Sequence, residues 1–445
     1  YLYRQWESPT AGHTYVLQGP DPMAITMPPA PEAGSAEFAA EIAEVYQMAL
    51  SRDVQIASFM DHSLVSTITK PDGTSVANAT MDRLKAGNRH AKDAAKRLGG
   101  MRWFKGEASN KVRAVPQHRK RRRFNQANEP SKGLSASTIF RGVGEDAWHT
   151  PFLSQFMLMG SNDPKDGKTR AESRAGGEIR YGAQRINQGV RVAIPNKDYM
   201  TQWADWLDVQ NGFGARKLVN NIKDEEFLPG EFRFMARLRD LATYVHDDQL
   251  YQAYLNAALL LASEEFAFDP GIPYHGASAS ELSKDNREPF ALFGGPHLLT
   301  LVTEVSSRAL KAVRLQKFSV HRRLRPEAAG ALFHTIYTAY EPNREMVGSQ
   351  PYAETGMSPD AEARRQLGST LARYTFDDHG AATDPVLEDI LEDIRLHNAK
   401  QNKEDPTDLN IAKWLLPMAF PEGSPMHPAY GAGLATVAGA CVTLR

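Results

Sequence analysis

The sequence has very little cysteine, no long apolar run and almost no net charge. Cys441 is the one cysteine in 445 residues, which excludes an intrachain disulfide and a cysteine-based zinc site. The apolar stretch 255–262 is far shorter than the roughly 20 residues that a membrane helix needs. A net charge of -1 gives no overall attraction to nucleic acid or to an anionic membrane. We therefore predict neither of these as a partner.

The opening of the chain shows no signal-peptide pattern, and it starts at Tyr1 rather than at Met. Together with the scarcity of cysteine, this predicts a soluble protein and leaves its location open between cytoplasm and periplasm. Residues 1–35 are rich in proline and glycine and lack helical spacing, so we expect an extended arm that packs on another subunit. The remainder, 36–445, is expected to form one helical domain.

Helical periodicity dominates what the sequence does contain. Apolar residues three or four apart, or long runs of helix-favouring residues, predict helices over these segments: 35–64, about 225–262, 295–318 and 385–398. Polar stretches at 105–135 and 340–375 predict loops, and strand-like alternation is scarce. The fold class is therefore predicted to be all-α, a large helical bundle.

A basic segment ends the third predicted helix, with the sequence KFSVHRRLRPE at 317–327. If the helix continued through it, Lys317 and Arg325 would lie about 80° apart around the axis and roughly 12 Å apart along it. Their long side chains could then meet on one anion, because lysine offers a point charge and arginine a planar fork of donors. Pro326 disfavours helix at Arg325 and places it near a helix end. The alternative is a solvated basic helix end.

A turn-rich stretch, PEGSPMHPAYGAGLAT, occupies 421–436 and leads into small helix-compatible residues from 435 to 442. A loop that delivers backbone N–H groups at a helix N-terminus favours an oxyanion site. The alternative is tight packing of small residues against a neighbouring helix.

Together the two segments, Lys317…Arg325-Pro326 and His427-Pro-x-Tyr-Gly-Ala-Gly, resemble the vanadium-dependent haloperoxidases of the red-algal bromoperoxidase type and the related acid phosphatases. Three flanking stretches match the bromoperoxidase branch: YGAQR at 181–185, WLDVQNG at 206–212 and FALFGGPH at 290–297. The resemblance is good over 150–330 and 415–445, and weak over 1–150 and 340–410.

The resemblance implies a vanadate cofactor and specific roles. Lys317 and Arg325 would bind vanadate oxygens, the Gly433 amide would donate to another, and His427 would tune hydrogen bonding nearby. Hydrogen peroxide would bind, Lys317 would polarise it, and a halide, bromide above all, would attack to give hypohalous acid that halogenates small organic substrates. The family also implies a large homo-oligomer, a dodecamer, and the arm at 1–35 suits such an assembly.

Three departures from the family pattern bear on activity. Leu434 stands where the family has its acid–base histidine, and leucine cannot transfer a proton. The family's vanadium-ligating histidine lies well downstream of this motif, so we expect it beyond Arg445 and find no metal ligand within 1–445. Ala432 replaces a small hydroxyl residue that some relatives keep. These departures favour a non-catalytic structural homologue as the alternative. A phosphate-binding or phosphatase-like protein also stays open, because phosphate shares the tetrahedral shape and charge of vanadate.

Other features carry less weight. The loop 274–287 corresponds to a calcium-binding region in some relatives, but only Glu281 and Asp285 there are oxygen ligands, which argues against calcium. The run 118–123, HRKRRR, is interpreted as a solvated loop or an ion-pair surface. His246-Asp247-Asp248 lacks a further ligand at helical spacing, so we expect no metal there, and His297 is interpreted as a structural histidine.

Overall fold

The computed structural model describes residues 21–31, 35–59, 78–105, 134–141, 151–162, 176–213, 226–246, 248, 250–264, 266, 290–340, 385–408, 411 and 413–443. The predicted largely helical class is confirmed, and two small antiparallel sheets accompany the helices. The α-helices are α1 (Ala36–Leu50), α3 (Asn78–Gly100), α4 (Arg102–Lys105), α8 (Trp203–Gln210), α9 (Leu238–His246), α10 (Gln252–Ser263), α11 (Gly295–Leu315), α12 (Pro326–Tyr340), α15 (Pro385–Asn402) and α16 (Gly433–Thr443). Short 3-10 turns are η2 (Pro22–Ala24), η3 (Ile56–Phe59) and η5 (Gln155–Met157), and η9 (Gln316–His321) is a π-helical turn. The strands are β1 (Glu178–Tyr181), β2 (Gln184–Asn187), β3 (Val190–Ala193) and β4 (Phe227–Arg233).

Helix α1 begins directly after Ser35, as the sequence predicts. The Ser35 hydroxyl accepts the Phe38 amide at 3.1 Å, which satisfies one of the amides that a helix start leaves unpaired. The helix ends at Leu50, earlier than the predicted 64, because Arg52 and Asp53 are drawn into tertiary contacts described below. The part of that prediction beyond Phe59 lies outside the described residues.

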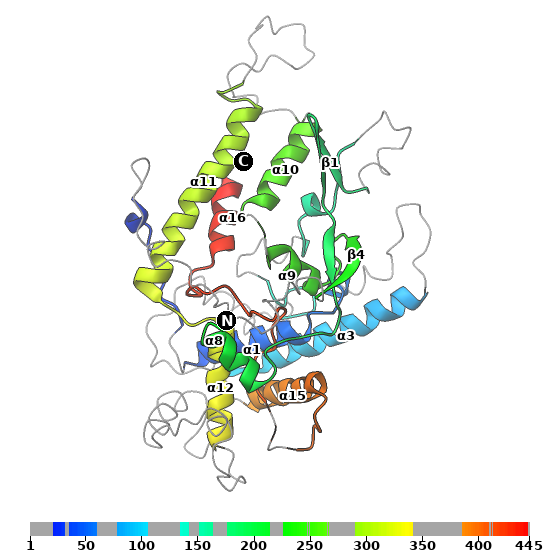
Figure 1. Ribbon diagram of the computed structural model, residues 1–445, viewed down its shortest axis with the longest axis vertical. Helices are drawn as coiled ribbons and strands as arrows, with labels where there is room; N and C mark the ends of the chain where they lie inside the picture. The colour runs from blue at the N-terminus through cyan, green and yellow to red at the C-terminus, as the bar shows by residue number, and fades with distance from the viewer. Residues whose placement is uncertain are drawn as a thin grey trace, which may run out of the picture.

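The main core lies between α1, α3, α4 and α15, which form the lower half of the molecule in Figure 1. Helix α15 presents Leu387, Ile390, Leu391 and Ile394 to it, and this i, i+3, i+4, i+7 spacing makes one fully buried stripe. Each such side chain stabilises the fold by about 1.5–3 kcal/mol through burial. The helix predicted at 385–398 is thereby confirmed and extends to Asn402.

A second helical layer stands above this core and holds α10, α11 and α16 (Figure 1). Helix α11 packs on α16 through small residues: the Ser306 hydroxyl lies 3.1 Å from the Cys441 sulfur, and Ala309 lies in the same buried cluster as Val437. None of the helices in the described part is both long and apolar enough to cross a membrane.

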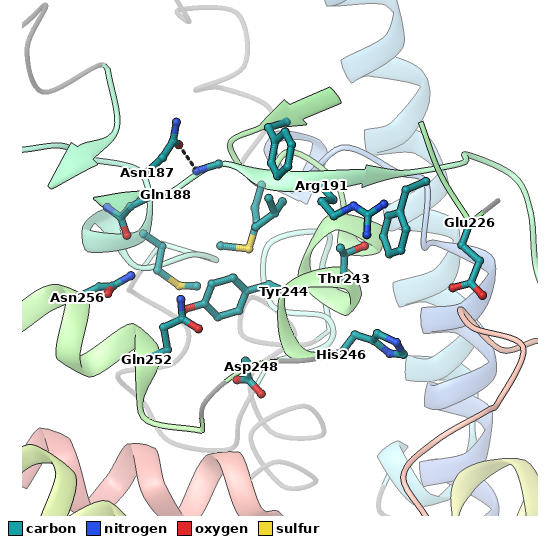
Figure 2. A pocket seen from close by; sticks show the side chains of 16 residues that line it. Asn187, Gln188, Arg191, Glu226, Thr243, Tyr244, His246, Asp248, Gln252 and Asn256 are labelled. Atoms are coloured by element: carbon teal, nitrogen blue, oxygen red, sulfur yellow. Dashed lines mark hydrogen bonds between the residues drawn. The ribbon is translucent and has the colours of Figure 1, made fainter. Parts of the chain in front are cut away.

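The two sheets flank α9 and α10. Strand β1 pairs with β2, and β3 pairs with β4 in the register Val190↔Arg233 and Arg191↔Phe232. The helix predicted from about 225 is therefore wrong at its start: 227–233 is a strand, and Gly230 within it has φ +69°, which a helix does not allow. Helices α9 and α10 occupy the rest of that prediction. A cavity of about 280 Å³ lies between the β3–β4 pair and these two helices (Figure 2).

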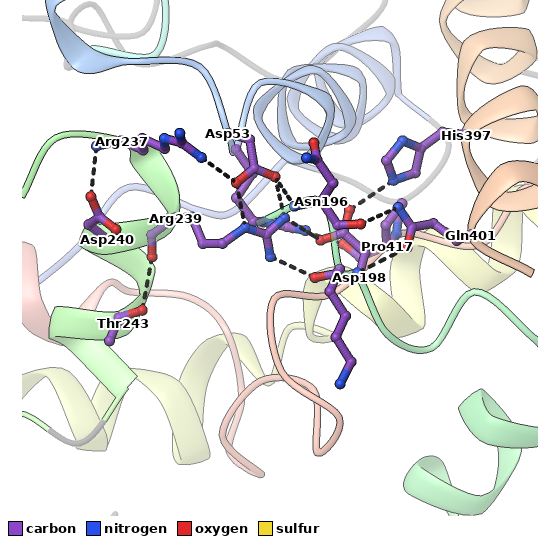
Figure 3. A network of polar contacts seen from close by, with 12 residues as sticks. Asp53, Asn196, Asp198, Arg237, Arg239, Asp240, Thr243, His397, Gln401 and Pro417 are labelled. Atoms are coloured by element: carbon purple, nitrogen blue, oxygen red, sulfur yellow. Dashed lines mark hydrogen bonds and ion pairs between the residues drawn. The ribbon is translucent and has the colours of Figure 1, made fainter. Parts of the chain in front are cut away.

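A buried ionic network ties α9 to the main core (Figure 3). Arg239 of α9 donates to both oxygens of Asp53, at 2.8 and 2.6 Å, and to Asp198 at 3.0 Å. Asp198 also accepts from Arg52 and lies 2.8 Å from His397 Nε2 on α15. Four chain segments far apart in sequence thus meet at one carboxylate, which fixes α9 and α15 against the end of α1.

The segment after α11 departs from prediction. Lys317 and Arg325 do not share one continuous helix, because the chain widens into η9, then turns at Arg322 with a left-handed φ of 45° before α12 begins at Pro326. Pro326 is the reason for the break: its ring disfavours helical backbone at Arg325, and its fixed φ suits the first helical position. The expectation that Arg325 lies at a helix end is confirmed. The loops predicted at 105–135 and 340–375 lie almost entirely outside the described residues.

Candidate functional site

The two segments singled out in the sequence lie side by side. The Ala429 amide donates to the Arg323 carbonyl at 3.0 Å, and the His321 ring meets Tyr430 edge-on with centroids 4.8 Å apart. Residues about a hundred positions apart therefore share one surface, built by η9 on one side and by the loop before α16 on the other.

Lys317 is held inside this junction. Its side chain is almost fully buried, and Nζ donates to the carbonyls of Pro428 at 3.0 Å and Ala429 at 3.4 Å. Burying an ammonium is costly unless its donors are satisfied, and these two backbone carbonyls accept from it. The Lys317 ammonium is thereby held beside the 428–429 loop.

Arg325 reaches the same loop through Ser424. Its Nε donates to the Ser424 hydroxyl at 2.8 Å, and that hydroxyl donates to the Glu327 carboxylate at 2.5 Å. The Ser424 amide adds a third bond, at 3.0 Å to Glu327 Oε1. The short polar chain from Arg325 through Ser424 to Glu327 fixes the guanidinium, although Arg325 itself stands just outside α12.

His427 reports the electrostatic character of the junction. Burial lowers the pKa of His427, the bond from its Nδ1 to the Pro428 carbonyl opposes that shift, and the charges of Lys317, Arg325 and Arg314 lower the pKa further, to about 4. Three cations therefore act on one imidazole, which is neutral at neutral pH. The junction is a region of positive potential.

Helix α16 begins at Gly433, next to this loop. The first helical bond that closes its N-terminus runs from the Thr436 amide to the Ala432 carbonyl, so the amides before Thr436 are the ones that a helix start leaves for other acceptors. A Cβ on Gly433 would lie 3.9 Å from the Leu310 side chain, about two helical turns before Lys317. Leu434 is 38% exposed, and Ala432 is exposed as well.

The described part of the N-terminal arm packs on its own chain. The Gln316 side chain donates to the Ile25 carbonyl at 2.8 Å, and the Tyr430 hydroxyl donates to the Pro28 carbonyl at 2.8 Å. Met27 contacts Gly431 so closely that a Cβ there would lie 2.2 Å from its methyl group. Residues 21–31 thus contact both site segments of their own chain, while Met23 and Ile25 remain exposed. Packing of the arm on another subunit stays a prediction, and residues 1–20 lie outside the described part.

Two known proteins are similar in sequence to nearly the whole of this chain. Vanadium-dependent bromoperoxidases from Corallina officinalis and Ascophyllum nodosum are 38% and 26% identical over 449 and 440 residues, which is 99% and 98% of this chain. The chain is homologous to the vanadium-dependent bromoperoxidases. It spans 63% of the length of the Corallina bromoperoxidase and 58% of the Ascophyllum one. No protein-family model matches it.

A solved bromoperoxidase shares the fold. The homohexameric vanadate-dependent bromoperoxidase AnII from Ascophyllum nodosum aligns with a TM-score of 0.62 at 22% identity, covering 99% of this chain and 55% of that one. At this identity the likeness concerns the fold alone. The largely helical bromoperoxidase architecture expected from the sequence motifs is thereby confirmed.

Sequence reasoning missed the polar partners of the site. Ser424 and Glu327 were quoted within the two motifs but given no role, and Arg314 was not singled out. An available signal was the position of Glu327, an acidic residue in the first turn of a helix that starts with proline. Ser424 carried no such signal, because its role depends on the contact between two distant segments.

The remaining expectations have mixed outcomes. His297 Nδ1 accepts the Phe293 amide at 3.0 Å, so His297 is a structural histidine at the start of α11, as expected. Within the described part of the chain, no group of three or more His, Cys, Asp and Glu residues could hold a metal ion. The basic run 118–123 and the calcium candidates Glu281 and Asp285 lie outside the described residues.

Proposed function

We propose that this chain carries the oxyanion-binding part of a vanadate-dependent haloperoxidase, an enzyme that oxidises halide, bromide foremost, with hydrogen peroxide to hypohalous acid. One observation supports this above others: the buried Lys317 ammonium and the Arg325 guanidinium both reach the loop that carries His427, at Pro428 and at Ser424. A small oxyanion is the ligand that best relieves such a concentration of positive charge. The homology to bromoperoxidases supports vanadate as that oxyanion.

The residues present fit this group. Lys317 and Arg325 would neutralise its negative charge, and the amide of Gly433, at the positive end of the α16 dipole, would donate to it beside Ala432. When bound, vanadate supplies a Lewis-acidic centre that activates hydrogen peroxide toward halide. His427 stays neutral near pH 7, so it can exchange hydrogen bonds without adding to the positive charge. Small organic molecules would receive the halogen from hypohalous acid.

Leu434 supports a second candidate, a homologue that binds the oxyanion with little or no turnover. Its side chain lies in the first turn of α16 and cannot accept or donate a proton. Loss of such a group typically reduces a rate by about 10²–10⁴. A phosphatase-like activity needs proton transfer too, so Leu434 argues against it as well, while phosphate binding remains compatible with the site.

For the assembly we propose a homo-oligomer larger than a dimer. Support comes from the related Ascophyllum structure, which is homohexameric. The dodecamer expected from the sequence resemblance remains a prediction beside that hexamer.

Calorimetric titration with orthovanadate and with phosphate tests the proposed site. Lys317→Met keeps the length of the side chain but removes its charge. It should lower the affinity for both anions by about 10–100-fold, which is the contribution of a charge-assisted hydrogen bond. Lys311→Met, an exposed position on α11, is the matched control and should bind like the wild type. Equal affinity of the Lys317→Met variant and the wild type contradicts the proposal, and a bromination assay then separates the haloperoxidase from the non-catalytic alternative.

A further inference from the structure

A second set of polar side chains converges in the cavity between β3, β4, α9 and α10, and it shares no residue with the oxyanion site. Figure 2 shows Tyr244, Gln252 and Asn256 pointing toward the same space, with Asp248 below them. At about 280 Å³ the cavity is just below the usual range of about 300–1,000 Å³ for ligand pockets, which suits only a small organic molecule.

Asn256 offers a side-chain amide to this cavity. The residue is 7% exposed, and no hydrogen bond of its side chain is found among the described residues. Its amide is therefore available to a bound molecule. Tyr244 and Gln252 likewise have no side-chain hydrogen bond within the described part of the chain, although both line the cavity.

The charge of the lining favours a cation. The lining carries two carboxylates, Glu226 and Asp248, and one guanidinium, Arg191, which lies over the Phe227 ring at 4.1 Å. His246 pairs with Glu422 at 3.0 Å and adds no net charge of its own. Burial raises the pKa of Asp248, opposed by its own backbone amide. Burial together with Asp248 raises the pKa of the Tyr244 phenol to about 12.

The cavity also has apolar side chains in its lining. Met157, Met235 and Phe232 line the same cavity, and thioether and aromatic groups accept the hydrocarbon part of a ligand. We propose that this cavity binds a small organic ammonium ion. The ammonium group pairs with the Asp248 carboxylate and donates its N–H groups to Tyr244, Gln252 and Asn256. The hydrocarbon part of the ligand packs against Met157, Met235 and Phe232. This site is independent of the proposed vanadate site.

Saturation-transfer NMR titration of the chain with benzylamine tests this, with benzyl alcohol as the neutral probe of the same shape. Benzylamine should bind saturably and at least about tenfold more tightly than the alcohol, since only the amine offers a positive charge to Asp248. Equal binding of the two probes, or no saturable binding of benzylamine, overturns the proposal.

Variants sharpen the test. Asp248→Asn keeps the shape of the side chain and removes its charge. It should lower the affinity for benzylamine at least about tenfold and leave the affinity for benzyl alcohol unchanged. Asp82→Asn, an exposed carboxylate on α3, is the control and should change neither. If circular dichroism shows that Asp248→Asn does not fold, Gln252→Leu replaces it and should weaken the amine as well. Wild-type affinity for benzylamine in whichever of these variants folds contradicts the assignment.

Discussion

Among single residues, Ser424 has the most specific position in the oxyanion site. Its hydroxyl separates the Arg325 guanidinium from the Glu327 carboxylate while bonding to both. Without that hydroxyl, Glu327 can pair with Arg325 directly and compete with an incoming anion. We expect Ser424→Ala to weaken orthovanadate and phosphate binding by about 5–30-fold, the effect of roughly 1–2 kcal/mol.

The control for Ser424 is Ser307→Ala, which removes an exposed hydroxyl on α11 that donates to the Thr303 carbonyl of the same helix. Calorimetric titration of both variants checks the prediction. If Ser424→Ala and Ser307→Ala bind the anions equally well, Ser424 does not position Arg325.

Leu434 is the residue that leads us to expect low catalytic activity. The chain should show little bromination with vanadate and hydrogen peroxide, because no proton-transfer group occupies the first turn of α16 beside Gly433. Leu434→His should raise the rate of bromination by a factor of at most about 10²–10⁴, the usual contribution of a general acid–base group, without reaching that of a related bromoperoxidase. A rate for Leu434→Gln as high as for Leu434→His would show that proton transfer is not what the position lacks.

His427 gives a prediction about pH. Its pKa is about 4 in the folded chain, against 6.5 for a free imidazole. The unfolded state therefore binds more protons between pH 6.5 and 4, and folding stability should fall as pH decreases through that window. Urea unfolding at pH 7 and pH 5 should show a smaller loss of stability in His427→Gln than in the wild type. Bound phosphate should raise the pKa of His427 in an NMR titration, because it neutralises the nearby cations.

At the scale of elements, the ionic network around Asp198 fixes how the segments meet (Figure 3). The Asp198 side chain is 1% exposed and the Arg239 side chain 3%. Burial alone would raise the pKa of Asp198, but Arg52, the His397 hydrogen bond and Arg239 lower it below its usual range, so the carboxylate stays ionised. An ion held this way stabilises the fold only while its partners are present.

Asp198→Asn should therefore destabilise the protein by about 3–5 kcal/mol, because it leaves Arg52 and Arg239 with less compensating charge in a buried setting. Glu304→Gln makes the same chemical change in the exposed i,i+4 pair with Arg308 on α11 and should cost about 0.3–0.5 kcal/mol. Chemical unfolding of both variants measures the difference. Similar losses would mean that the network adds nothing beyond surface pairing.

At the scale of the whole molecule, the arm has two separable roles to test. Residues 21–31 hold Gln316 and Tyr430, so deletion of 1–31 should weaken phosphate binding, whereas deletion of 1–20 should not. Both deletions should reduce the assembly size if 1–20 contacts a neighbouring subunit. Light scattering and calorimetry on the two truncations separate these effects. A monomeric wild type, or an assembly unchanged by either deletion, would contradict the proposed oligomer.

Local patterns in the sequence were enough to predict much of the fold. The stripe of α15, the cap at Ser35 and the proline at the start of α12 each act within a few residues, so the printed order of amino acids determines them. The long apolar face of α11 is of the same kind. The strand at 227–233 was not predictable this way, because it forms by pairing with β3 at 190–193.

Some residues of the candidate site could likewise be predicted from the sequence, and others could not. Lys317, Arg325 and His427 could be picked out from the sequence because their residue types and their neighbours in the chain carry the signal. Ser424, Glu327 and Arg314 acquire their roles only where the loop before α16 meets the end of α11. The amino-acid order thus determined the helices and the charged residues of the site, while the tertiary structure alone decided their partners, since contact and burial between distant segments set the bonds and the pKa of a side chain.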